Sequence, residues 1–177
     1  MRTKDLAQAA LLVAIGFILH AFFPPMVLGM KPDFALAMMF ILLIVKRDFK
    51  LGFLVAVSTG IFTALTTGFP GGQVANIVDK LLTFLIVYPL IPVVLNLMPH
   101  RIAAGLITAV GTIISGGIFL GTAALIVGLP GPFTVLFTTV VLPAAAVNTV
   151  AAVIVFSVVH LAIEVDNVED VEEVEEA

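Results

Sequence analysis

Long apolar runs separated by short polar breaks make up most of the chain. Measured against the breaks, these runs predict six transmembrane helices. We place the helices at residues 6–23, 34–45, 51–66, 78–97, 102–128 and 133–163. The second run is too short to cross the hydrocarbon layer alone, so we expect it to begin inside the preceding loop or to be sheltered by neighbouring helices. Pro89 and Pro92 predict a kink in the fourth helix.

Composition supports this reading and narrows the function. Of the 177 residues, 61% are hydrophobic and 11% are charged, which leaves too little polar surface for a water-soluble domain. The expected fold class is an all-α membrane protein whose six-helix domain covers residues 1–163. The sequence contains no cysteine, no phosphate-binding loop, no paired metal-binding histidines and no nucleophile elbow. We therefore assign no catalytic residue, metal or cofactor, and expect solute binding and movement rather than an enzyme.

Charge is distributed unevenly along the chain. Residues 164–177 contain eight of the twelve acids and no base, and we expect a disordered acidic tail there. With six helices, six bases fall on one side of the membrane and two, Lys31 and Lys80, on the other. Basic loops favour the cytoplasm, so both termini are predicted to be cytoplasmic. The six bases on that side are Arg2, Lys4, Lys46, Arg47, Lys50 and Arg101.

The two outer loops each carry an acid and a base within three positions. Lys31 and Asp33 end the first loop, and Asp79 and Lys80 open the fourth predicted helix. Charges at a bilayer edge are costly unless they are hydrated, paired or functional. A bound zwitterion would place its carboxylate near one of the lysines and its ammonium near one of the aspartates. The alternative is that each acid and base form a local ion pair that fixes the shape of its loop.

Further polar and aromatic side chains accompany these charges. The second outer loop is rich in proline and glycine, which lets a backbone approach a ligand closely, and its Gln73 and Asn76 supply amide donors and acceptors. Asn148 lies well inside the sixth helix, five residues after Pro143. It either forms a hydrogen bond to a neighbouring helix or lines a cavity. The apolar surface for a ligand side chain would come from Phe22, Phe23, Met30, Phe34 and Phe69.

Small residues recur at intervals of four on two helices. Ala10 and Ala14 stand on the first helix, and Gly117 and Gly121 on the fifth. This spacing lets two backbones approach and gain dispersion contacts. The residues either pack within this chain or, at the Ala10 and Ala14 face, dock onto another subunit.

The loop motifs also carry a resemblance to a known family. The chain resembles the TrpP-type bacterial tryptophan transporters in GMKPDF at 29–34, TTGFPGGQ at 66–73 and NIVDK at 76–80, and in span number and motif order over residues 1–163. These transporters resemble the substrate-binding S components of energy-coupling factor (ECF) transporters. The resemblance implies an S-component-like bundle with a solute pocket near the outer face, and a first-helix motif that contacts a coupling transmembrane subunit driven by two ATPases. Ala10 and Ala14 match that motif.

Carried over by position, the pocket residues implied by this resemblance are Lys31, Asp33, Gln73, Asn76, Asp79 and Lys80. Asn148 is added from its place in the sixth helix alone. The expected partners are a small solute such as tryptophan, membrane lipid and the ECF subunits, and no nucleic acid. Two alternatives stay open: a stand-alone proton-coupled transporter that titrates Asp33, Asp79 or His20, and a non-transporting membrane scaffold.

Overall fold

The computed structural model describes residues 2–25 and 29–175, and side chains as far as residue 162. Residues 26–28 of the first outer loop and the side chains of the acidic tail lie outside the described residues. The helices are α1 (Thr3–Phe22), α2 (Phe34–Lys46), α3 (Phe49–Leu65), α4 (Gly72–Val87), η1 (Tyr88–Leu90), α5 (Ile91–Leu97), α6 (His100–Ile126), α7 (Phe133–Leu136), η2 (Phe137–Val141) and α8 (Leu142–Glu175).

These helices form six consecutive segments that match the six predicted ones. Four segments are long and apolar enough to cross a membrane, and two shorter apolar helices, α2 and α3, stand between the first and second of them. The prediction of an all-α, multi-pass membrane fold is confirmed to this extent. The four long segments are Thr3–Phe22, Gly72–Leu97, His100–Ile126 and Phe133–Ala162.

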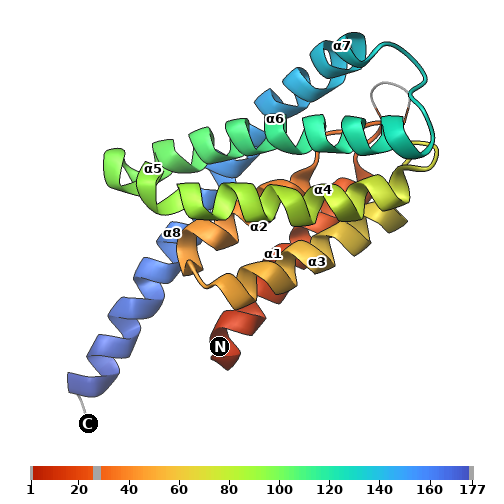
Figure 1. Ribbon diagram of the computed structural model, residues 1–177. Coiled ribbons are helices and arrows are strands. Elements are labelled where there is room, and N and C mark those ends of the chain that lie inside the picture. The colour runs from red at the N-terminus through yellow and green to blue at the C-terminus, as the bar shows by residue number, and fades with distance from the viewer. Residues whose placement is uncertain (1, 26–28, 176–177) are drawn as a thin grey trace.

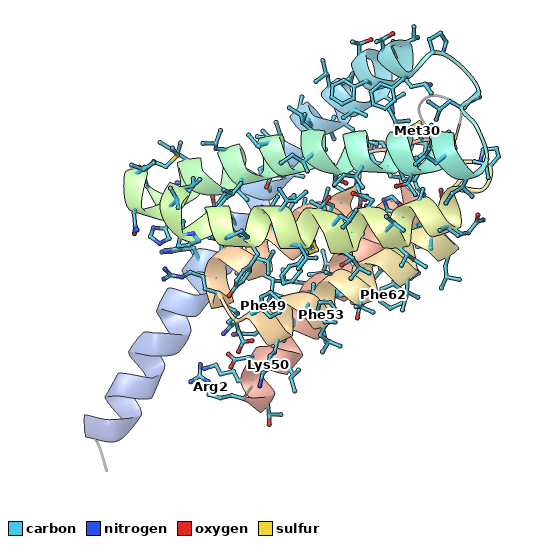
Figure 2. All side chains as sticks on the ribbon, in the orientation of Figure 1. Arg2, Met30, Phe49, Lys50, Phe53 and Phe62 are labelled. Carbon is cyan, nitrogen blue, oxygen red and sulfur yellow. The ribbon has the colours of Figure 1, made fainter. Side chains whose placement is uncertain are left out.

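The helices pack so that α6 lies between α4 and α8, while α1 packs against α2 and α3. The α1–α2, α3–α4 and α6–α7 connections gather at one end of the molecule, and the two chain ends lie toward the other (Figure 1). Arg2 and Lys50 lie near the N-terminus, and Met30 lies at the far end (Figure 2). An ion pair of 2.8 Å between Lys46 and Asp5 joins α2 to α1 at the end with the termini.

The short helix α2 occupies the centre of the bundle. Its 13 residues span about 20 Å, less than the roughly 30 Å of a bilayer core. Every residue from 34 to 44 is buried by neighbouring helices, including Phe40, which is 0% exposed. The expectation that this run is sheltered rather than exposed to lipid is confirmed.

Prolines shape the two segments that are not continuous α-helix. Pro89 lies in the 3₁₀ turn η1, where the fourth segment passes from α4 to α5, as the predicted kink requires. Pro143 follows the π-helical turn η2. Because proline has no N–H and its ring clashes with the carbonyl four residues earlier, the α-helical hydrogen-bond pattern is interrupted just before it.

Small residues of α6 permit close packing inside the chain, but not at every position. A Cβ atom added at Gly111 would lie 2.3 Å from the ring of Phe40, and one added at Gly116 would lie 2.4 Å from Val141. At Gly117 the nearest atom, on Phe137, would be 3.8 Å away, and at Gly121 nothing lies within 4 Å. Packing within the chain therefore explains Gly111 and Gly116 and does not explain Gly121.

A matched pair of substitutions on α6 tests this difference. We expect Gly111→Ala to lower stability by about 1–3 kcal/mol, because Phe40 is fully buried and has no room to move. Gly121→Ala, made in the same helix at an open position, is expected to leave stability unchanged or slightly raised. Thermal unfolding of the detergent-purified variants measures both, and an equal shift for the two would contradict the assigned packing.

Most helix boundaries differ from those expected by three residues or fewer, and two differ by more. Helix α4 begins at Gly72 rather than at residue 78, because Gly71 completes the turn with a φ of 70° and no residue from 73 to 78 opposes helix. Asp79 and Lys80 consequently lie two turns inside α4 instead of opening it. At the other end of the chain, α8 continues to Glu175 rather than ending at residue 163. The disorder expected of the acidic tail, whose side chains lie outside the described residues, stays a prediction.

Candidate solute-binding pocket

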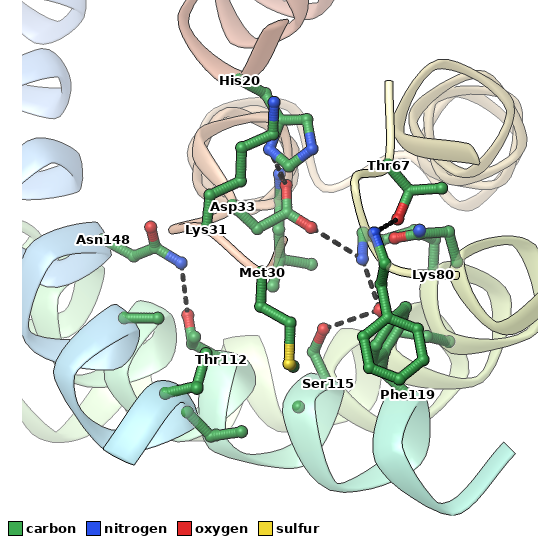
Figure 3. Close-up of a pocket in the computed structure, with 18 of the residues that line it drawn as sticks. His20, Met30, Lys31, Asp33, Thr67, Lys80, Thr112, Ser115, Phe119 and Asn148 are labelled. Carbon is green, nitrogen blue, oxygen red and sulfur yellow. Dashed lines mark hydrogen bonds and ion pairs between the residues drawn. The ribbon is translucent and has the colours of Figure 1, made fainter. Parts of the chain in front are cut away.

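A pocket opens at the end of the bundle opposite the chain ends. It encloses about 600 Å³ of space, a figure that includes the part open to solvent. Its walls come from α1, the α1–α2 and α3–α4 connections, α2, α4, α6, η2 and α8 (Figure 3). Residues that are far apart in sequence thus surround one space.

A buried cluster of charges forms one side of this pocket. The ammonium of Lys80 lies 2.7 Å from a carboxylate oxygen of Asp33 and also donates a hydrogen bond to Asp79. Lys80 and Asp79 are each 1% exposed. The hydroxyls of Thr83 and Ser115 each donate to Asp79 at 2.9 Å. Desolvation of these charges is costly, and the cost is offset by their mutual attraction and by the hydroxyl donors.

Local structure explains how these side chains meet. Asp79 and Thr83 are four residues apart and therefore share one face of α4. Gly60 lets α3 approach α4 closely, since a Cβ atom there would lie only 3.3 Å from the Cα of Ile77. Asp33 caps the N-terminus of α2 by accepting a 2.9 Å hydrogen bond from the backbone N–H of Leu36. The start of α2 thus fixes the carboxylate that Lys80 reaches.

Two further bases border the cluster near Asp33. The Nδ1 atom of His20 is 3.2 Å from the carbonyl oxygen of Pro32 and 3.6 Å from Asp33. Because a carbonyl only accepts, the contact with Pro32 requires the proton to be on Nδ1. The ammonium of Lys31 is 3.4 Å from the carbonyl oxygen of Ala21.

The charged loop residues influence each other's ionisation. Burial raises the pKa of Asp33, but the charges of Lys80 and His20 and the hydrogen bonds from Lys80 and the Leu36 backbone together lower it by more, so the net shift is downward. Burial lowers the pKa of Lys31, and Asp33 partly opposes this effect. Asp33 is therefore an ionised carboxylate at neutral pH.

The remaining walls are mostly apolar. The rings of Phe69 and Phe119 meet edge to face with centroids 5.4 Å apart, and Met30 lies beside them. Val140 and Val141 of the π-helical turn η2 face the pocket, and Gly116 makes room for Val141. These surfaces suit a flat apolar group.

Asn148 contributes an amide from α8. Its side chain is 0% exposed, and its Nδ2 donates to the hydroxyl of Thr112 on α6 at 3.3 Å. Its Oδ1 has no hydrogen-bond partner among the residues that the structure describes.

The α1–α2 and α3–α4 connections touch beside the pocket. Gly29 has a φ of 78°, and a Cβ atom there would lie 2.2 Å from the carbonyl oxygen of Gly68. Both glycines also line the pocket. Only residues without side chains allow this backbone contact.

Most of the residues singled out from the sequence converge on the pocket. Those that line it are Lys31, Asp33, Asn76, Asp79, Lys80 and Asn148, together with Met30 and Phe69. Asn76 also donates to the carbonyl oxygen of Gly72 at 2.9 Å. Gln73 is exposed on the first turn of α4 and does not line the pocket, and neither do Phe22, Phe23 and Phe34.

Sequence reasoning gave no binding role to several pocket residues. His20 was considered only as a titrating group of the proton-coupled alternative. Thr112, Ser115 and Phe119 lie on α6 and were not identified at all. The sequence does contain a pattern that marks this side of α6, because Thr108, Thr112 and Ser115 repeat at helical spacing on one face of an otherwise apolar segment.

Comparisons with known proteins agree on one family. The family model described as "Tryptophan transporter TrpP" matches residues 2–164. A "Probable tryptophan transport protein" of Clostridium perfringens (strain 13 / Type A) is 44% identical over 167 residues, which cover 89% of this chain and 92% of the relative. The protein of the same description from Bacillus subtilis (strain 168) is 43% identical over 160 residues, covering 90% and 92%. No solved structure matches the chain.

Proposed function

The chain belongs to the TrpP family of tryptophan transporters, and from this premise we propose that it is the tryptophan-binding membrane subunit of an ECF-type importer. It is a multi-pass membrane transport protein and not an enzyme. The observation that carries the proposal is one pocket that combines a buried, balanced set of charges with aromatic and aliphatic walls.

The charge balance of the pocket favours a zwitterion. The two lysines and two aspartates that line it, Lys31, Asp33, Asp79 and Lys80, have formal charges that sum to zero. An amino acid is also neutral overall, so it binds without leaving an unbalanced charge in the pocket. A ligand with net charge would lose that advantage.

The contacts divide these four groups into two roles. Asp79 accepts from Lys80, Thr83 and Ser115, so its hydrogen-bonding capacity is largely used within the protein. Asp33 is less buried, with 15% of its side chain exposed, and lies beside Lys31 in the first outer loop. We assign the ligand ammonium to Asp33 and its carboxylate to Lys31, while Asp79 holds Lys80 in place.

The indole ring is assigned to the apolar part of the pocket. Phe69 and Phe119 offer an aromatic corner, and Met30 adds a polarizable thioether next to it. The close contact of Gly29 with Gly68 lets the two outer connections cover a bound ligand.

The outer face of α1 supports docking to a coupling subunit. Ala10 and Ala14 are exposed, and so are Leu11 and Ile18 beside them. Small residues flanked by large apolar ones allow another transmembrane helix to approach closely. We further propose that both chain termini lie on the cytoplasmic side of the membrane, where the ATPases act, and that the docking face of α1 links the chain to them.

A bulky substitution on this face tests the docking role. We expect Ala14→Leu to reduce ATP-dependent tryptophan import at least tenfold, because the larger side chain keeps the partner helix away, and to leave tryptophan binding in detergent within twofold of wild type. Ala146→Leu, at an exposed alanine of α8, is the matched control and should change neither quantity. Unchanged import by Ala14→Leu would contradict docking at this face.

A second candidate function, proton-coupled transport by the chain alone, is favoured by the 3.6 Å approach of His20 to Asp33. Vesicle uptake separates the two functions. Labelled tryptophan is offered to vesicles that contain the chain alone or the chain with the coupling subunit and both ATPases. We expect ATP-dependent uptake only in the complete vesicles, whereas uptake by the chain alone under an imposed proton gradient would support the second candidate.

A further inference from the structure

One buried polar atom of the pocket is left without a partner. The Oδ1 atom of Asn148 accepts no hydrogen bond from any residue that the structure describes, although the side chain is fully buried and lines the pocket. One of the two N–H groups on its Nδ2 is donated to the hydroxyl of Thr112. Buried side-chain acceptors are nearly always paired in folded proteins, so this oxygen points to a donor supplied by the ligand.

The position of Asn148 shows which part of a ligand it meets. Thr112, which holds Asn148, and Ser115, which holds Asp79, are three residues apart on α6 and share one face. Asn148 and Lys80 extend toward the pocket from opposite sides, with Met30 between them (Figure 3). A ligand held at the charged cluster by its amino-acid end therefore extends its side chain toward Asn148.

The surroundings of Asn148 restrict the kind of ligand group that can donate to its Oδ1 atom. Val140, Val141 and Ala144 form an apolar wall on the same side of the pocket. A charged donor is disfavoured there, whereas a neutral N–H on a flat apolar ring fits both the wall and the acceptor. Tryptophan carries one such group, the indole N–H, in addition to the ammonium that is assigned to Asp33.

We propose that Asn148 accepts a hydrogen bond from the indole N–H of bound tryptophan and so selects tryptophan over amino acids whose aromatic ring has no donor. The inference rests on the proposed function and adds to it the residue that determines specificity. An analogue without the N–H leaves this buried acceptor unpaired, and its binding is weakened because the oxygen has lost its contact with water and gained no hydrogen bond.

A comparison of two ligands and three proteins tests the role. Calorimetric titration of the detergent-purified chain uses L-tryptophan and its benzothienyl analogue, in which sulfur replaces the indole N–H. Wild type is expected to bind tryptophan about 10–100-fold more tightly than the analogue. In Asn148→Leu and in the smaller Asn148→Ala, this ratio is expected to fall to near one while the analogue still binds.

Thr108→Val is the matched control. Thr108 also has a buried hydroxyl without a partner among the described residues, but it lies outside the pocket, so this variant should keep the wild-type ratio. A ratio near one in wild type, a ratio unchanged in both Asn148 variants, or equal loss of both ligands in them would overturn the role of Asn148. Wild type that binds neither ligand would instead overturn the proposed function.

Discussion

Replacing Lys80 with methionine is expected to abolish tryptophan binding and to lower the thermal unfolding midpoint by about 10 °C. The ammonium of Lys80 is the shared partner of Asp33 and Asp79, and it is 1% exposed. Its removal leaves the carboxylates of Asp33 and Asp79 without the cation that they share, which costs about 3–5 kcal/mol for a buried pair. Differential scanning fluorimetry and calorimetric titration in detergent measure the two effects.

Two further variants make this result specific. Lys50→Met removes an exposed lysine near the opposite end and should change neither stability nor binding. The double variant Asp79→Asn, Lys80→Met removes one of the stranded carboxylates and should recover part of the unfolding midpoint without restoring binding. A Lys80→Met protein with wild-type stability would show that the cluster does not hold the pocket together.

The second large effect is expected at Asp33. Asp33→Asn should weaken tryptophan binding about 100-fold, or about 2.7 kcal/mol, because the ligand ammonium loses its charged partner. Indole-3-propionate has no ammonium and carries a net negative charge, so it should bind the variant no more weakly than wild type, because Asp33→Asn leaves the pocket with one more positive charge. Titration of both ligands into both proteins therefore separates loss of the ammonium contact from general damage to the pocket.

Asp48→Asn provides the control for this substitution. Asp48 caps α3 as Asp33 caps α2, each accepting a 2.9 Å hydrogen bond from the N–H three residues ahead. Asparagine is also a good N-cap, so both variants should keep their helices. If the two variants lost tryptophan affinity equally, or if Asp33→Asn weakened both ligands to the same degree, the ammonium contact would be wrong.

Lipid chemistry made the helices predictable from the sequence. Each span must satisfy its backbone hydrogen bonds internally and present apolar side chains, so the pattern of apolar runs located all six segments. The same reasoning anticipated that α2, which is too short to cross alone, would be sheltered by its neighbours. The start of α4 was missed because glycine and proline mark a turn but do not specify where the following helix begins.

Pairing between distant residues was beyond sequence reasoning. The sequence placed Lys31 with Asp33 and Asp79 with Lys80 as neighbours, whereas the ion pair of Lys80 with Asp33 joins α4 to the first outer loop. That contact depends on how α4 lies against α3 and α6, which a single sequence does not encode in any local pattern. Gln73 shows the same limit, since one helical turn decides whether it faces the pocket or solvent.

Asn148 was predictable in part. An amide inside an apolar span stands out in the sequence because it is costly in lipid, and it does lie in the pocket. Its partner Thr112, and the oxygen that is left unpaired, emerge only when α6 and α8 are packed together.

Calorimetric titration of the purified chain in detergent with L-tryptophan tests the central claim most directly. Other amino acids, thiamine, riboflavin and biotin serve as comparison ligands. We expect saturable binding of tryptophan at one site per chain and far weaker binding of the other compounds. A folded chain that binds none of the tryptophan offered, or that binds one of the other compounds in its place, would contradict a tryptophan pocket.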